Sequence, residues 1–347
     1  ALGDELLATN ADLVGLFLRY TLDPHGRSKQ VVRETEAAIP ILEAAGDHGG
    51  LVRAWRLLGW VHGTACNYGA AERAVQQAVM HARLAGDRRA ESRNLMSLAL
   101  SALYGPMPVP DAIVVGRRIA AEIGDDRSAE GVVLCALAHL HALRGEPDEA
   151  RTLYRRARRT LHDLGGRMMA ATVSLDSGRV ELLAGDPVQA ERELRRDYDV
   201  LVAARERYTL STVAAMMADA VLRQGRIDEA LALTTESKVL SADDDVESQS
   251  LWRRVRARAL VRRGQLADAV VLVDEAFTLV ERTDASLSKA NALVDMATVH
   301  AAAGHDELAV GLARRALALF EAKRADVDIT TTRGLIEHLR AGHPTGT

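Results

Sequence analysis

The sequence predicts an all-α fold, a right-handed α-solenoid in which helical hairpins of about 40 residues stack in one array. The main observation is a glycine followed five residues later by an alanine, repeated at intervals of 39 or 40 residues. The five pairs are Gly145/Ala150, Gly185/Ala190, Gly225/Ala230, Gly264/Ala269 and Gly304/Ala309. A fixed interval of this length is typical of solenoids, because every unit must present the same faces to its neighbours.

The composition of the 347 residues agrees with this prediction. Hydrophobic residues make up 48% of the chain, but only 3% of it is aromatic and there are only 8 prolines. This favours thin, closely packed helices in a folded protein. The net charge of −4 provides no basic field that would attract nucleic acid or acidic lipid.

Each repeat is expected to form two antiparallel helices, as the segment 246–281 illustrates. Leu251 and Val255 recur at helical spacing in the first helix, and Gly264 follows its end. Glycine suits the left-handed position just past a helix, where a side chain costs about 1 kcal/mol. The small side chain of Ala269 then allows the second helix to pack closely against the first.

The same template predicts eight hairpins and a terminal helix within one array over residues 1–340. The expected hairpins are 3–45, 50–85, 88–123, 127–163, 168–204, 207–240, 247–281 and 286–323. The second helix of the fifth hairpin is expected to run unbroken over 187–204. A polar cap helix over 330–340 closes the array, and 341–347 form a tail. The Pro-rich turn at 105–110 is interpreted as a longer loop, with a kink between two halves as the alternative.

A short motif places the repeats in a known class. Trp55, Leu58 and Gly59, followed by Ala71 twelve residues after that glycine, match the first-helix pattern of a tetratricopeptide repeat. The usual period of this repeat is 34 residues, so a period of about 40 lengthens each helix by about a turn. HEAT repeats have a similar length but lack the glycine and alanine signature.

Three segments carry a more specific resemblance. They are 244–253 (DDVESQSLWR), 178–187 (GRVELLAGDP) and 280–285 (VERTDA). They resemble the C-terminal repeat region of bacterial signalling proteins that join a class III adenylate/guanylate cyclase domain, an AAA-type P-loop ATPase module and a tetratricopeptide-like array. The resemblance extends to about residue 340. It implies an arm that senses or scaffolds, attached to catalytic modules.

The sequence offers no residue set for catalysis, a cofactor or a metal ion. It has no G-x-x-x-x-G-K-[ST] phosphate-binding loop and no predicted strands to carry a cyclase or P-loop core. His139 and His141 are two residues apart, so on a helix they face different ways and cannot hold one metal ion. Cys66 and Cys135, both within helical patterns, have no partner at metal spacing. We therefore expect a chain that is not an enzyme, with any catalytic modules outside it.

The same features indicate a cytoplasmic location. Two cysteines make no disulfide framework, which is typical of a reducing compartment. No apolar run approaches the length of a membrane span, and no charged-then-apolar leader opens the chain. Because the first residue is Ala1 rather than Met, we expect a fragment of a longer protein.

Candidate binding residues follow from the register of the first helices. In tetratricopeptide arrays these helices line the concave face at the second, fifth, ninth and thirteenth positions of each unit, with the glycine at position fifteen. The predicted groove residues are Arg53, Arg56, Trp60, His139, Arg179, Asp219, Arg254, Arg258 and Arg262. The last three arginines are four residues apart and form one basic stripe, which suits an acidic peptide or a chain carboxylate. The alternative is a solvated face with partners one turn away.

A second basic run lies on an expected outer helix. It comprises Arg151, Arg155, Arg156, Arg158 and Arg159. A solvated face is favoured over a nucleic-acid site, because the net charge is negative and aromatic residues are few.

The sequence therefore predicts a protein-interaction or sensory scaffold, the regulatory arm of a larger cyclase or ATPase signalling protein. Its partners are expected to be a protein or an acidic peptide, or catalytic domains of the same polypeptide. The alternative is an arm that senses a small-molecule effector, like the helical arms of large LuxR-type ATP-binding transcription regulators.

Overall fold

The computed structural model describes residues 2–22, 27–204 and 207–341, and within them it contains eighteen helices and no strand. The first helices of the hairpins are α1 (Leu2–Leu22), α3 (His48–Thr64), α5 (Arg88–Tyr104), α7 (Arg127–Leu143), α9 (Arg167–Leu183), α12 (Arg207–Arg223), α14 (Val246–Arg262) and α16 (Ser286–Ala302). The second helices are α2 (Ser28–Ala44), α4 (Tyr68–Leu84), α6 (Val109–Glu122), α8 (Pro147–Asp163), α10 (Pro187–Arg196) with α11 (Tyr198–Ala203), α13 (Ile227–Leu240), α15 (Leu266–Glu281) and α17 (Asp306–Lys323).

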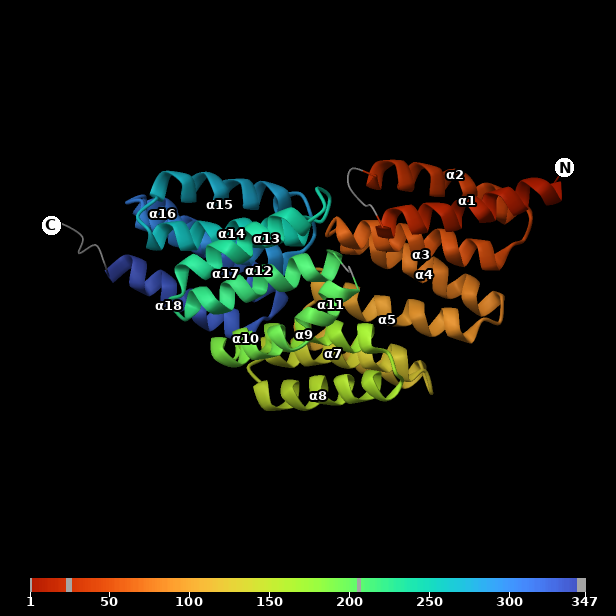
Figure 1. Ribbon diagram of the computed structural model, residues 1–347, viewed down its shortest axis with the longest axis horizontal. Coiled ribbons are helices and arrows are strands. Elements are labelled where there is room, and N and C mark those ends of the chain that lie inside the picture. Colours follow the sequence, from red (N-terminus) through yellow and green to blue (C-terminus); the bar gives the residue numbers. More distant parts are fainter. Residues whose placement is uncertain (1, 23–26, 205–206, 342–347) are drawn as a thin grey trace.

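Helix α18 (Asp326–Ala341) follows the last hairpin, and consecutive hairpins stack side by side (Figure 1). Helices α1 and α18 lie toward opposite ends of the longest axis. The predicted fold class, an all-α solenoid of tetratricopeptide-like hairpins, is confirmed. The tail expected over 341–347 lies outside the described residues, apart from Ala341 at the end of α18.

The glycines that mark the repeat have the backbone conformation that the sequence predicts. Gly145, Gly185, Gly225, Gly264 and Gly304 have φ between 75° and 83°, two residues past the end of a first helix. A side chain is disfavoured in this left-handed region, which explains the recurring glycine.

Glycine also permits close packing within the hairpins. A Cβ atom at Gly59 would lie 2.7 Å from Cγ2 of Val75 in α4. A Cβ atom at Gly178 would lie 2.6 Å from the side chain of Leu194 in α10. Both first helices approach their second helices where the side chain is missing, as the tetratricopeptide motif at Gly59 implies.

Three local expectations need correction. Cys66 does not lie in a helix: it occupies the left-handed position between α3 and α4, with φ of 56°, where other repeats have glycine. The helix expected over 187–204 breaks at Asp197, whose backbone (φ −112°, ψ 2°) leaves the helical region while its carboxylate pairs with Arg158 of α8. The last helix begins at Asp326 rather than near 330, because the left-handed Arg324 ends α17 and allows a new helix to start at once.

The C-terminal helices also pack against the N-terminal half of the array, and we call this contact the closure of the array. One core cluster joins α4–α7 to the C-terminal helices, through residues such as Leu103, Leu140, Leu293 and Phe320. Helix α18 contacts α7, although almost 200 residues separate them in sequence. The concave face is therefore bounded at one end by the protein's own last repeat.

One polar contact fixes this closure at the start of α4. The carboxylate of Asp284, in the turn before α16, accepts hydrogen bonds from the backbone N–H groups of Tyr68 (2.6 Å) and Gly69 (2.7 Å). Asn67, the residue before α4, makes no side-chain cap. Asp284 thus satisfies two N–H groups at the positive end of the helix dipole.

Replacing Asp284 by alanine is expected to lower the free energy of unfolding by about 1–2 kcal/mol, the usual cost of losing an N-cap. Urea unfolding followed by circular dichroism measures the change. Asp268→Ala, an exposed carboxylate in the first turn of α15, is the control with a smaller loss. Equal losses in both variants would count against the capping role.

None of the helices within the described residues combines the length and the apolarity that a membrane span requires.

Candidate ligand-binding pocket on the concave face

The N-terminal half of the concave face contains a pocket of about 620 Å³. Its lining comes mainly from the first helices α1, α3, α5, α7, α9 and α12, with three residues from α4. This volume lies within the range of about 300–1,000 Å³ that is usual for ligand sites. We call it the aromatic–arginine pocket, after the residues described next.

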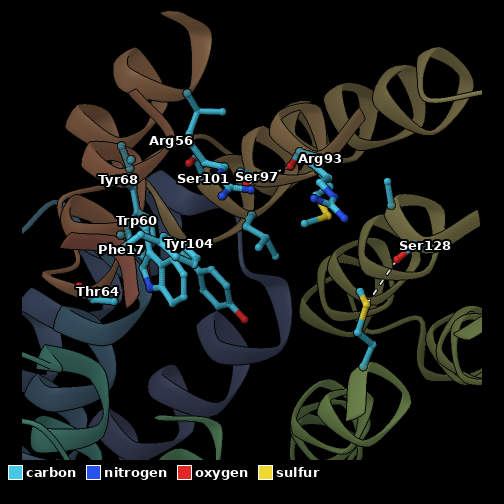
Figure 2. A pocket seen from close by; sticks show the side chains of 18 of the residues that line it. Phe17, Arg56, Trp60, Thr64, Tyr68, Arg93, Ser97, Ser101, Tyr104 and Ser128 are labelled. Carbon is cyan, nitrogen blue, oxygen red and sulfur yellow. Dashed lines mark hydrogen bonds between the residues drawn. The ribbon is translucent and has the colours of Figure 1, made fainter. Parts of the chain in front are cut away.

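One side of the pocket is aromatic (Figure 2). Phe17 of α1 and Trp60 of α3 meet edge to face, with ring centroids 5.2 Å apart. Tyr68 of α4 stacks on Tyr104 of α5, with centroids 5.7 Å apart. Together these rings offer apolar surface with polar edges, which suits a partly apolar ligand.

Arginines also line the pocket. Arg56 of α3 lies on the aromatic side, whereas Arg89 and Arg93 come from α5, and Figure 2 shows Arg93 across from Trp60. The guanidinium of Arg56 lies 5.2 Å from the centroid of the Phe17 ring. Among the described residues, none of these three arginines has a carboxylate within salt-bridge distance. Burial and the positive charges of Arg93 and Arg53 lower the pKa of Arg56.

The carboxylate that lines the pocket is already engaged. Asp126 precedes α7, and its side chain accepts a hydrogen bond from the backbone N–H of Ala129 at 3.0 Å. Asp126 therefore acts as the N-cap of α7. The lining consequently has three cationic side chains and one anionic side chain, and the excess positive charge faces the open space.

Behind the pocket, Tyr104 rests on two of the predicted groove residues. His139 packs edge to face on its ring (5.9 Å), and the guanidinium of Arg179 lies 5.3 Å from the ring centroid. Arg179 also reaches Glu247 of α14 at 3.5 Å. Burial, together with the charges of Arg179 and Lys323, lowers the pKa of His139 well below its ordinary value. His139 is thus a neutral packing residue.

The remaining groove arginines belong to an ion network in the C-terminal half. Asp295 of α16 accepts a hydrogen bond from Arg254 (2.7 Å) and forms an ion pair with Arg258 (3.1 Å). Asp219 of α12 pairs with Arg258 (2.8 Å) and Arg223 (3.0 Å). Burial acts to raise the pKa of Asp219, but Arg258 and Arg223 hold it at about 2. The negative charges of Asp219 and Asp295 and the positive charges of Arg254 and Arg258 are therefore balanced within the protein.

The structure thus separates the nine predicted groove residues into groups. Arg56 and Trp60 line the pocket, and His139 and Arg179 support it from behind. Asp219, Arg254 and Arg258 are joined in the ion network. Two predicted residues remain: exposed Arg53 beside the pocket, which donates to Asn10, and exposed Arg262 at the end of α14.

The basic run of α8 is largely paired within the protein. Glu181, fully buried in α9, accepts from Arg151 (2.7 Å to Oε2) and from the hydroxyl of Tyr154 (2.7 Å). Arg158 pairs with Glu193 at 3.0 Å, and Arg156 pairs with Glu130. These contacts hold α8 to neighbouring helices, in agreement with the structural interpretation of the run.

No group of three or more histidine, cysteine, aspartate or glutamate side chains suited to a metal ion occurs in the part of the chain that the structure describes.

The two cysteine thiols are buried. Burial is the largest cause of the raised pKa of the thiols of Cys66 and Cys135. A thiol that stays protonated is a poor nucleophile.

Sequence comparison agrees with the motif. A family model described as the tetratricopeptide repeat matches residues 131–156, 173–196, 212–234 and 252–275. The matches fall on the hairpins α7–α8, α9–α10, α12–α13 and α14–α15. The chain therefore contains tetratricopeptide repeats. Among curated proteins, no significant match to this sequence is found.

Two solved structures share the fold at low identity. A Rap protein complexed with competence and sporulation factor is 8% identical, with 98% of each chain covered and a TM-score of 0.57. A Signal Transduction ATPase with Numerous Domains (STAND) protein with a tetratricopeptide repeat sensor, from Pyrococcus horikoshii, is 10% identical, with a TM-score of 0.52. That match covers 90% of this chain but only 53% of the ATPase, so this chain spans about half of that protein. BtubC from P. vanneervenii is 14% identical over 62% of this chain and 89% of its own, with a TM-score of 0.45.

Proposed function

We propose that this chain is a non-catalytic protein-interaction and sensory scaffold of the cytoplasm, the regulatory arm of a larger signalling protein with ATPase or cyclase modules. The observation that carries the proposal is the aromatic–arginine pocket, in which arginines without carboxylate partners face an open concave surface. Such unbalanced charge beside aromatic surface is typical of a binding site rather than of a packing contact.

Two similar structures support the same class of function. The P. horikoshii STAND protein is described as having a tetratricopeptide repeat sensor, and the Rap protein is seen in complex with competence and sporulation factor. The sequence resemblance to cyclase and ATPase signalling proteins implies the same arrangement, a repeat arm beside catalytic modules. By analogy, this array would report the binding of a partner to the rest of its polypeptide.

The test is affinity capture from extracts of the host, with the purified chain as bait. Wild type is compared with Arg56→Gln/Trp60→Ala and with the matched control Arg262→Gln, which changes an exposed arginine outside the pocket. A specific protein retained by wild type and control, and reduced at least about tenfold by the pocket variant, is the expected result. Equal capture by all three baits would contradict the role of the pocket.

The volume of the pocket favours a second candidate function, a small-molecule effector sensor like the helical arm of a LuxR-type regulator. A volume of about 620 Å³ suits a ligand of a few hundred daltons. Native mass spectrometry of the purified chain distinguishes the two, since the bare chain has a mass of 37.5 kDa. An added mass of a few hundred daltons would favour the small-molecule sensor, provided that it is lost on unfolding and absent from the Arg56→Gln/Trp60→Ala variant.

A further inference from the structure

We propose that the aromatic–arginine pocket selects a carboxylate attached to an aromatic or bulky aliphatic group. Arg56 and Arg93 would bind the carboxylate, while Trp60 and Phe17 would contact the apolar body. The inference rests on the proposed binding function and specifies the chemistry of the ligand, whether it is a small acid or the end of a peptide.

The need for an anion follows from a comparison of the arginines on the concave face. Arg254 and Arg258, in the C-terminal half, each have a carboxylate within 3.1 Å. Arg56 and Arg93 have none among the described residues, although both line the pocket and the charge of Arg93 lowers the pKa of Arg56. An anionic ligand would supply the missing partner and relieve this repulsion.

The burial of the arginines indicates a single negative charge. Arg56 is half-buried, whereas Arg89 and Arg93 are exposed and remain hydrated. One half-buried guanidinium is best balanced by one anionic group, and a planar carboxylate matches its fork geometry. A dianionic phosphate would lose more hydration in a pocket where only one cation is partly desolvated.

The apolar body follows from the rest of the lining. Phe17 and Trp60 meet edge to face, and Met96 and Leu100 of α5 extend the apolar surface between the arginines and Tyr104. An inorganic anion would leave this surface unused. A ring or branched chain beside the carboxylate would bury it, contributing roughly 25 cal/mol per Å² removed from water.

The experiment uses isothermal titration calorimetry with two matched pairs of probes. The first pair is 3-phenylpropionate and 3-phenylpropanamide, which differ only in the charged group. The second pair is the peptide N-acetyl-Gly-Gly-Phe with a free or an amidated C-terminus. Wild type is expected to bind the acid of at least one pair about tenfold or more tightly than its amide, and the better pair identifies the source of the carboxylate.

Four variants separate the contributions. Arg56→Gln/Arg93→Gln is expected to lose the preference for the acid, and Arg262→Gln to keep it. Trp60→Ala is expected to weaken acid and amide alike, because it removes the apolar contact. Arg93→Gln alone alters only an exposed side chain, so it keeps the test valid should the double variant fail to fold.

Three results would overturn the proposal. They are equal affinity of wild type for acid and amide in both pairs, binding of phenyl phosphate more tightly than 3-phenylpropionate, and an acid preference that survives in the arginine variants. Capture of a protein partner through the pocket without any acid preference would reject this ligand chemistry and leave the proposed scaffold function standing.

Discussion

Replacing Asp295 by alanine is expected to lower the free energy of unfolding by about 3–5 kcal/mol, the usual cost of leaving buried charges without a partner. Asp295 is only 5% exposed and forms ion pairs with both Arg254 and Arg258. Arg254 has no other carboxylate partner among the described residues, and it is 8% exposed, so water cannot replace the lost contact. Urea unfolding at neutral pH, followed by circular dichroism, measures the loss.

Two variants make this result specific. Asp268→Ala changes an exposed aspartate of α15 and is expected to cost less than about 1 kcal/mol. Adding Arg254→Met to Asp295→Ala removes the orphaned cation, so the double variant should be more stable than the sum of the two single losses predicts, by roughly 1–3 kcal/mol. Additive losses would mean that the two side chains do not interact as the structure describes.

The ion network bears on function because it divides the concave face into two kinds of surface. In the C-terminal half, Arg254 and Arg258 are balanced by the protein itself, so an anionic ligand there would first have to displace Asp295 or Asp219. In the N-terminal half, Arg56 and Arg93 have no such competitor. A ligand therefore gains more from the pocket than from the arginine stripe.

The fold was predictable because its signals are local and repeated. Each positive-φ glycine and the alanine after it constrain one turn and one close packing contact, and five copies at one spacing leave little alternative to a solenoid. The break at Asp197 was not predictable, since it depends on a neighbouring helix rather than on the local pattern. The left-handed Cys66 follows the repeat register, but without a glycine the residue itself gives no signal of this conformation.

The pocket was predictable in part. Counting back from Ala71 in the second hairpin identified Arg56 and Trp60. Arg93 and Tyr104 were missed because the third hairpin has no glycine two residues past its first helix, and its alanine, Ala112, is shifted by one residue. Helices α5 and α7 have the same length of 17 residues. Aligning them end to end would have placed Arg93 and Tyr104 at the second and thirteenth positions of the repeat unit. The closure of the array, which brings Asp284 to α4, has no signal in a single repeat.

Lysine 323 provides the second large effect, and this effect depends on pH. Lys323, at the end of α17, is 1% exposed and donates to the carbonyl oxygens of Ala102 (3.1 Å) and Gly105 (2.6 Å) at the end of α5. Lys323→Met would leave both acceptors buried without this donor. At pH 9 the free energy of unfolding of the variant is expected to be about 2–4 kcal/mol lower than that of wild type.

The sign of the pH dependence follows from the buried amine. Burial lowers the pKa of Lys323 from 10.5 to about 7 in the folded protein. Between these values the unfolded chain binds the proton and the folded chain does not, so wild type gains stability as pH rises. The advantage of wild type over Lys323→Met should therefore grow from pH 7 to pH 10, by up to about 1.4 kcal/mol per pH unit. His139 does not obscure this trend, because its lowered pKa keeps it neutral throughout the range.

Unfolding of wild type, Lys323→Met and Lys29→Met at pH 6, 8 and 10 tests this dependence. Lys29 is exposed on α2, so its variant should follow wild type at every pH. A constant difference between wild type and Lys323→Met would mean that the amine stays charged in the folded protein. In that case the α5 carbonyls bind an ammonium ion, and the contact between α17 and α5 is equally strong at all three pH values. The measurement therefore decides whether alkaline conditions tighten the closure that bounds the concave face or leave it unchanged.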